Sequence, residues 1–187
     1  MQIVFLGPPG AGKGKQAVRL AKNLNIVHLS TGDMLRQAAA DKTPVGLQSQ
    51  EYLTAGKLVP DSVMLDLVNE RLAKQDCAGG YLLDGFPRTL GQAEALDALL
   101  AKRNTPLTAV VELELDVEVL TKRLVARGRE DDKPDVILER LKQYKLQTAP
   151  LSDYYRQRSL LHEVDGSGTP DEVFQRIRGL VDGVAQQ

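Results

Sequence analysis

The sequence predicts an α/β protein with one parallel sheet of five strands, covered by helices on both faces. Two observations favour this fold class. Short apolar segments alternate with amphipathic helical segments along the 187 residues, which is the pattern of parallel strands joined by crossover helices. A glycine-rich loop at residues 7–13 also stands between an apolar strand and a helical segment. The chain is 42% hydrophobic, which at this length supports a single well-buried core.

The expected strands and helices follow from this alternation. The strands are expected at 2–6, 26–29, 81–84, 109–115 and 160–164. The helices are expected at about 13–23, 31–41, 45–55, 61–75, 89–101, 117–127, 135–158 and 170–181.

Two segments interrupt the alternation. Residues 30–59 add helices without a strand, and residues 128–135 form a charged break between two helices. Ligands of open parallel sheets bind beyond the carboxyl ends of the strands, and both segments are expected to emerge there. We therefore expect them to be mobile covers over a ligand. The alternative is that they are ordinary surface insertions.

Composition narrows the classes of partner and site. The formal net charge is −1, aromatic residues make up 4% and tryptophan is absent, so neither nucleic acid nor an anionic membrane is an expected partner. The single cysteine, Cys77, permits no internal disulfide and no cysteine zinc cluster, and suits a reduced compartment. His28 and His162 are expected to be core residues of strands and are not spaced for zinc.

No apolar run approaches the ~20 residues of a membrane span, and the chain begins directly in a strand rather than a signal peptide, so we expect a cytoplasmic protein.

The glycine-rich loop predicts a phosphate-binding site. Residues 7–13 read Gly-Pro-Pro-Gly-Ala-Gly-Lys, which fits the P-loop pattern G-x-x-x-x-G-K. Glycines let backbone N–H groups turn inward, the helix start adds partial positive charge, and Lys13 can reach the outer phosphates of a nucleotide. The predicted fold is therefore P-loop NTPase-like, with three layers. The pattern expects Ser or Thr after the lysine, whereas Gly14 and Lys15 follow here.

Charged residues elsewhere fit phosphoryl transfer. Asp84 ends a predicted strand, where a carboxylate beside a P-loop can hold Mg²⁺ through water. Alone, an aspartate before glycine is more often a turn residue. Arg88 can present its planar fork to a phosphate. Further arginines cluster near the charged break, namely Arg123, Arg127, Arg129 and Arg140. They provide positive charge for phosphoryl transfer, unless they form a solvated basic face paired with acidic neighbours.

Longer segments resemble adenylate kinases over essentially the whole chain. The matching segments are 7–16, 29–36 (Leu-Ser-Thr-Gly-Asp-Met-Leu-Arg), 56–60, 81–89 with Gln92, and 148–151. The resemblance implies an enzyme that catalyses the reversible, Mg²⁺-dependent reaction ATP + AMP = 2 ADP. It also implies a monomer with a parallel core (1–29, 60–125 and 137–187), an NMP-binding domain (30–59) and a short lid (126–136). This lid lacks the cysteines of zinc-bearing lids, so no zinc is expected.

The resemblance also implies roles for individual residues. The residues implied to bind ATP are Gly10, Ala11, Gly12, Lys13, Gly14, Lys15, Arg123, Arg127 and Gly168. Those implied to bind AMP are Thr31, Arg36, Lys57, Leu58, Val59, Gly85, Phe86, Pro87, Arg88 and Gln92, with Arg129 and Arg140 closing onto the phosphates. The implied catalytic residues are Lys13, Asp84, Arg88, Arg129 and Arg140, with Asp84 supporting the metal.

Lys15 departs from the family, which has threonine at this position. An ammonium group has only donors and cannot ligate Mg²⁺. In one interpretation, Lys15 lowers turnover by competing with the metal. In the other, Lys15 points outward or only binds a phosphate. Two alternative functions remain: a kinase for another nucleoside monophosphate and, because of Lys15, a nucleotide-binding protein with little catalysis. Thr31 and Gln92 favour AMP by resemblance.

Overall fold

The structure is a computed structural model that describes residues 1–127 and 133–185. Its strands are β1 (Gln2–Leu6), β2 (Val27–Ser30), β3 (Tyr81–Asp84), β4 (Ala109–Glu114) and β5 (Leu161–Asp165). They form one parallel sheet in the order β2-β3-β1-β4-β5. The predicted fold class is confirmed, and each predicted strand boundary lies within one residue of the observed one.

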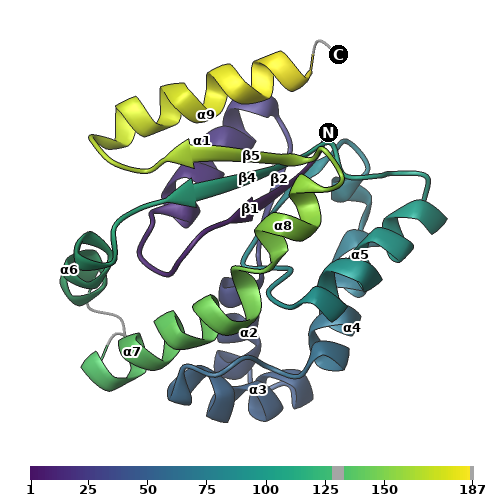
Figure 1. Ribbon diagram of the computed structural model, residues 1–187. Helices are drawn as coiled ribbons and strands as arrows, with labels where there is room; N and C mark the ends of the chain where they lie inside the picture. The colour runs from purple at the N-terminus through teal and green to yellow at the C-terminus, as the bar shows by residue number, and fades with distance from the viewer. Residues whose placement is uncertain (128–132, 186–187) are drawn as a thin grey trace.

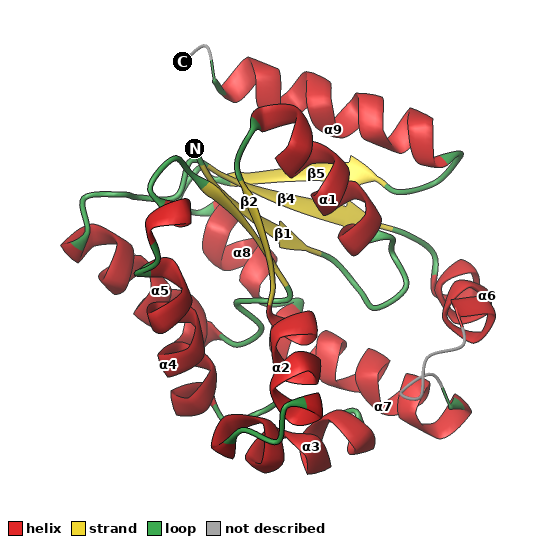
Figure 2. Ribbon diagram, turned by 180° about the vertical axis from the view of Figure 1, so that it is seen from behind, coloured by secondary structure: helices red, strands yellow, loops and turns green. Residues whose placement is uncertain are grey.

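Helices cover both faces of the sheet, giving three layers (Figures 1 and 2). One face carries α1 (Lys13–Leu24) and α9 (Pro170–Val184), and the other carries α4 (Asp61–Leu72), α5 (Leu90–Lys102) and α8 (Leu151–Arg156). Side chains alternate across a strand. Accordingly Ile3 and Phe5 of β1 belong to the core beneath α1 and α9, and Val4 and Leu6 to the core beneath α4, α5 and α8.

A helical unit lies beyond the carboxyl end of β2. It consists of α2 (Thr31–Ala40) and α3 (Pro44–Ala55), which pack on one another. Ser30 and Thr43 cap these helices by accepting from the backbone N–H groups of Asp33 and Gly46, as short hydroxyl side chains do at helix starts. The unit meets α7 (Pro134–Gln143), which Figure 1 shows alongside α3, and α6 (Val117–Arg127) precedes α7 in the chain.

The single helix predicted at 135–158 is interrupted. Helix α7 ends at Gln143, a π-helical turn covers Tyr144–Thr148, and α8 begins at Leu151. Pro150 explains the break, because it has no N–H group and its ring crowds the preceding turn. The backbone widens instead, and the Ala149 N–H donates to the Tyr144 carbonyl at 2.8 Å. The helix predicted at 61–75 likewise ends early, at Leu72, before a 3₁₀ turn at Gln75–Cys77.

Candidate active site

The glycine-rich loop joins β1 to α1. Gly10 has φ +89°, and a Cβ there would lie 2.9 Å from the Leu120 carbonyl oxygen, so only glycine lets the loop pass α6. No side chain in the described chain caps α1, and its first turn holds no acidic residue. These N–H groups are therefore suited to an anion. The Lys13 ammonium folds over the loop and donates to the carbonyls of Gly7 at 2.6 Å and Pro8 at 2.9 Å.

Asp84 lies at the carboxyl end of β3, next to the P-loop. In the sheet it stands opposite Phe5 on one side and Ser30 on the other. The residue is 9% exposed, and its Oδ2 lies 3.5 Å from His28 Nε2. A Cβ on Gly14 would lie 3.4 Å from the same oxygen, so the carboxylate faces the first turn of α1. His28 is half-buried on β2 rather than fully enclosed in the core.

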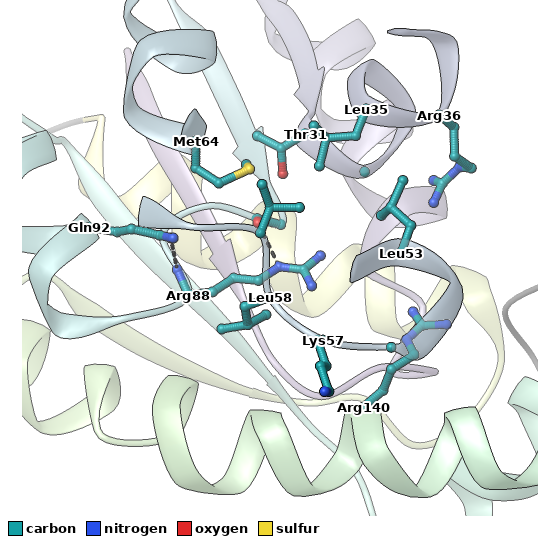
Figure 3. Close-up of a pocket in the computed structure, with 14 residues that line it drawn as sticks. Thr31, Leu35, Arg36, Leu53, Lys57, Leu58, Met64, Arg88, Gln92 and Arg140 are labelled. Atoms are coloured by element: carbon teal, nitrogen blue, oxygen red, sulfur yellow. Dashed lines mark hydrogen bonds between the residues drawn. The ribbon is translucent and has the colours of Figure 1, made fainter. Parts of the chain in front are cut away.

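A first cavity lies between the α2–α3 unit and the sheet. Four cationic residues line it, namely Arg36, Lys57, Arg88 and Arg140, and no carboxylate of the described residues does. Figure 3 shows Arg36, Lys57 and Arg140 toward one end, and Met64 and Gln92 toward the other. The cavity therefore combines an anion-binding end with a more apolar end that carries an amide.

A tight turn after β3 shapes this cavity. Gly85 has φ +84°, and a Cβ there would lie 3.0 Å from Thr31 Oγ1 and 3.1 Å from Arg88 Nη2. The glycine thus allows the Thr31 and Arg88 side chains to approach the turn. Arg88 Nε donates to the Gly85 carbonyl at 2.8 Å (Figure 3). Phe86 is fully buried in the core and lines neither this cavity nor the second one.

A second cavity adjoins the P-loop. It is lined by Lys13 from the loop, by Pro87 from the turn after β3, and by Tyr144 and Thr148 from the π turn. It shares five residues with the first cavity: Gly56, Leu58, Gly85, Arg88 and Arg140. The two cavities are therefore neighbours, and the shared arginines come from different elements, the turn after β3 and helix α7.

A buried acid supports the wall of the second cavity. The Tyr144 hydroxyl donates to Glu112 Oε1 at 3.0 Å, and Glu112 on β4 is 6% exposed. Burial, reinforced by the Glu112 charge, raises the pKa of Tyr144. The π turn is thus anchored to the sheet through a side chain that stays protonated.

The other predicted residues lie around the P-loop. The half-buried Arg123 lies on α6, which contacts the P-loop at Gly10. Arg127 ends α6, and Gly168 lies in the exposed loop before α9. Lys15 is exposed in the first turn of α1. Arg129, with positions 128–132 of the predicted lid, lies outside the described residues.

Sequence reasoning missed several lining residues. In the first cavity these are Gly32, Leu35, Leu53, Gly56 and Met64, and in the second Phe5, Leu6, Gln143, Tyr144 and Thr148. Segment 30–59 has apolar side chains but contains no strand that they could cover. This pattern could have predicted that Leu35 and Leu53 line a cavity.

Two classes of feature were not found in the described ranges. No helix there is long and apolar enough to cross a bilayer. No group of three or more His, Cys, Asp or Glu side chains is placed to hold a metal ion. Mg²⁺ does not need such a group, because one carboxylate, phosphate oxygens and water commonly complete its shell. Asp84 therefore fits Mg²⁺ that arrives with a nucleotide.

Comparisons with known proteins agree with this geometry. The family model described as adenylate kinase matches residues 5–160. The chain is 49% identical to an adenylate kinase of Xylella fastidiosa strain M23, over 95% of this chain and 97% of the relative. It is 47% identical to an adenylate kinase of Methylobacterium nodulans, over 98% of each chain. It is 49% identical to an adenylate kinase of Mycobacterium tuberculosis H37Ra, over 96% of this chain and 99% of the relative. The P-loop, the four-cation cavity and the second cavity beside it agree with these matches. The chain therefore belongs to the adenylate kinase family.

Proposed function

We propose that the two cavities are the acceptor and donor halves of one centre, in which this chain transfers the γ-phosphoryl group of ATP to AMP and forms two ADP. The observation that carries the proposal is that Arg88 and Arg140 line both cavities. A transferred phosphoryl group must stay in contact with positive charge from donor to acceptor. Arginines at the junction supply that charge without moving between two separate sites.

In the acceptor half, AMP occupies the first cavity. Its phosphate binds to Arg36, Arg88 and Arg140, and its base lies at the end formed by Met64 and Gln92. Thr31 and the segment Lys57–Val59 complete the binding site, and segment 30–59 acts as the NMP-binding domain. The distribution of charge within the cavity supports this orientation.

In the donor half, residues 10–15 wrap the phosphates of ATP. The uncapped first turn of α1 and the Lys13 ammonium provide donors and charge for these phosphates. Arg123 and Arg127 flank the nucleotide, the backbone near Gly168 approaches its adenine, and the lid at 126–136 brings Arg129 to the phosphates. The core lies in 1–29, 60–125 and 137–187, and the enzyme works as a monomer.

The family uses Mg²⁺ with ATP, and Asp84 is the residue that we propose holds it, through water. When bound, Mg²⁺ neutralises charge on the donor phosphates and orients them. Asp84 is suited to this role because its carboxylate lies beside the first turn of α1. His28 Nε2 lies 3.5 Å from the same carboxylate oxygen.

Lys15 keeps a second candidate function open, that of a nucleotide-binding protein with little catalysis. Its exposed ammonium lies in the same helical turn that we propose for the donor phosphates. There it would attract phosphate and compete with Mg²⁺ for the same oxygens.

One paired measurement separates these functions. ADP formation from ATP and Mg²⁺ is followed in a coupled assay with AMP or UMP as acceptor, while calorimetry records binding of each nucleotide. We expect kcat/KM for AMP to exceed that for UMP by at least about a hundredfold, because a hydrogen-bonding base site rejects a mispaired base. Comparable values would identify a kinase of different specificity. Binding of ATP and AMP without ADP formation would identify a binding protein.

A further inference from the structure

The Gln92 carboxamide is held from both ends. Its Nε2 donates to Asp61 Oδ1 at 2.7 Å. Its Oε1 accepts from the backbone N–H of Arg88 at 2.8 Å, the bond drawn in Figure 3. Gln92 is 2% exposed and lines the first cavity at the end away from Arg36. Its polar atoms are therefore placed by the protein before any ligand binds.

The two partners permit only one orientation of this amide. An ionised carboxylate can only accept, and a backbone N–H can only donate. Turning the amide over would set Gln92 Oε1 against Asp61 and Nε2 against the Arg88 N–H. Both contacts would then be repulsive, so the network itself defines which end is oxygen.

Asp61 is fixed in turn by the start of α5. Its Oδ2 accepts from the Thr89 hydroxyl at 2.8 Å, and Thr89 Oγ1 accepts from the Gln92 N–H at 3.2 Å as the cap of that helix. The carboxylate therefore joins the first residue of α4 to the amide on α5, across 31 positions of sequence. Since both Asp61 oxygens are engaged, the group is oriented rather than simply nearby.

We propose that Asp61 is a positioning residue that sets the purine specificity of the acceptor site by fixing the orientation of the Gln92 amide. The inference rests on the proposed function, in which Gln92 meets the edge of the AMP base. Each amide atom keeps one further hydrogen-bonding position, since Nε2 carries two hydrogens and Oε1 two lone pairs. This fixed pair fits the donor N6–H and acceptor N1 of adenine. Hypoxanthine presents the opposite pattern, acceptor O6 and donor N1–H.

The test is the ratio of kcat/KM for AMP to that for inosine 5′-monophosphate. Asp61→Asn keeps the size of the side chain but can either donate or accept, so the Gln92 amide is no longer forced into one orientation. We expect the ratio to fall about tenfold or more, through a higher KM for AMP and a lower KM for the inosine nucleotide. Asp66→Asn, an exposed aspartate of the same helix, removes equal charge and should leave the ratio unchanged.

A double-mutant cycle separates positioning from a structural effect. If Asp61 acts through Gln92, Asp61→Asn should not change the ratio in a Gln92→Ala background. Should Asp61→Asn fold poorly, Asp61→Ser removes the carboxylate while keeping a residue favoured at a helix start, with the same expectation. An unchanged ratio in either variant, or an equal loss in the Gln92→Ala background, would overturn the inference. Failure of the wild-type chain to form ADP from AMP would instead overturn the proposed function.

Discussion

The Thr148 hydroxyl donates to the backbone carbonyl of Arg88 at 2.9 Å, although 60 positions separate the two residues. Thr148 ends the π turn between α7 and α8 and is 7% exposed. Arg88 lines both cavities. This bond therefore connects the π turn that follows the helix of Arg140 to the backbone of the other shared arginine.

Removing the hydroxyl should misplace Arg88. We predict that Thr148→Val lowers kcat/KM about tenfold, because the carbonyl loses its donor and the arginine loses its fixed position. Steady-state kinetics with ATP and AMP measure the effect. Thr148→Ser keeps the donor and should retain activity close to that of the wild type. Equal losses in the two variants would show that packing of the threonine methyl group, rather than the bond, matters.

Ligand binding should favour the arrangement in which segment 30–59 meets α7. A Cβ on Gly56 would lie 3.0 Å from the Val136 carbonyl oxygen, so the two elements are in close contact. Four cationic residues line the first cavity, and Arg36 also pairs with Asp33. Bound phosphates add anionic partners for these cations, so they shift the population toward contact. A bisubstrate analogue carrying both adenosines should reduce the radius of gyration in solution scattering, and adenosine alone should not. An unchanged radius at saturation would refute this prediction.

Alkaline pH should destabilise the fold partly through Tyr81. Burial raises the pKa of Tyr81 to about 12, compared with ~10 in the unfolded chain. The native state therefore keeps a proton that the unfolded state loses between these values. Its contribution to stability is complete below pH ~10 and declines by about 1.4 kcal/mol per pH unit between the two pKa values.

Denaturant unfolding of the wild type and Tyr81→Phe at about pH 8 and about pH 11 tests this prediction. Phenylalanine cannot ionise, so the variant should lose about 1.4 kcal/mol less stability than the wild type between the two conditions. Equal losses in both proteins would mean that Tyr81 ionises with the same pKa in the native and unfolded states.

Replacing the unusual lysine should speed up turnover. We predict that Lys15→Thr raises kcat with Mg²⁺ by roughly ten- to a thousandfold, since each ~1.4 kcal/mol of recovered transition-state stabilisation is tenfold in rate. An ammonium attracts phosphate in the ground state as well, so nucleotide affinity without metal should fall or stay level.

A titration of Mg²⁺ at saturating ATP and AMP checks the prediction for Lys15. Lys22→Thr removes the same charge from the last turn of α1 and should change neither kcat nor the Mg²⁺ dependence. If Lys15→Thr also leaves both unchanged, Lys15 points away from the phosphates and the departure from the family is neutral.

Local patterns predicted the sheet and the P-loop because both depend on neighbouring residues. The apolar run before Gly7 and the helical spacing after Lys13 define β1 and α1 without information from the rest of the chain. The end of β3 at Asp84 followed from the same reasoning. Pro150 was a local signal for the break between α7 and α8. However, the helical periodicity around it favoured one continuous helix, so the interruption was not predicted.

The rest of the site depends on contacts between distant segments. Asp61 reaches Gln92, and Glu112 reaches Tyr144, only after the strands and helices have assembled. No periodicity or motif links such pairs. The same is true of the shared wall of the two cavities, since Arg88 follows a strand while Arg140 lies on α7.

The most direct test of the account follows the phosphoryl group itself. ATP with a radioactive γ-phosphate is mixed with AMP and Mg²⁺, and the products are separated over time. We predict that the label appears in ADP formed from AMP, and that Arg88→Met slows its appearance by about a hundredfold or more while the protein remains folded. Label that appears only in free phosphate, or transfer at the same rate in the variant, would contradict a transfer between the two cavities.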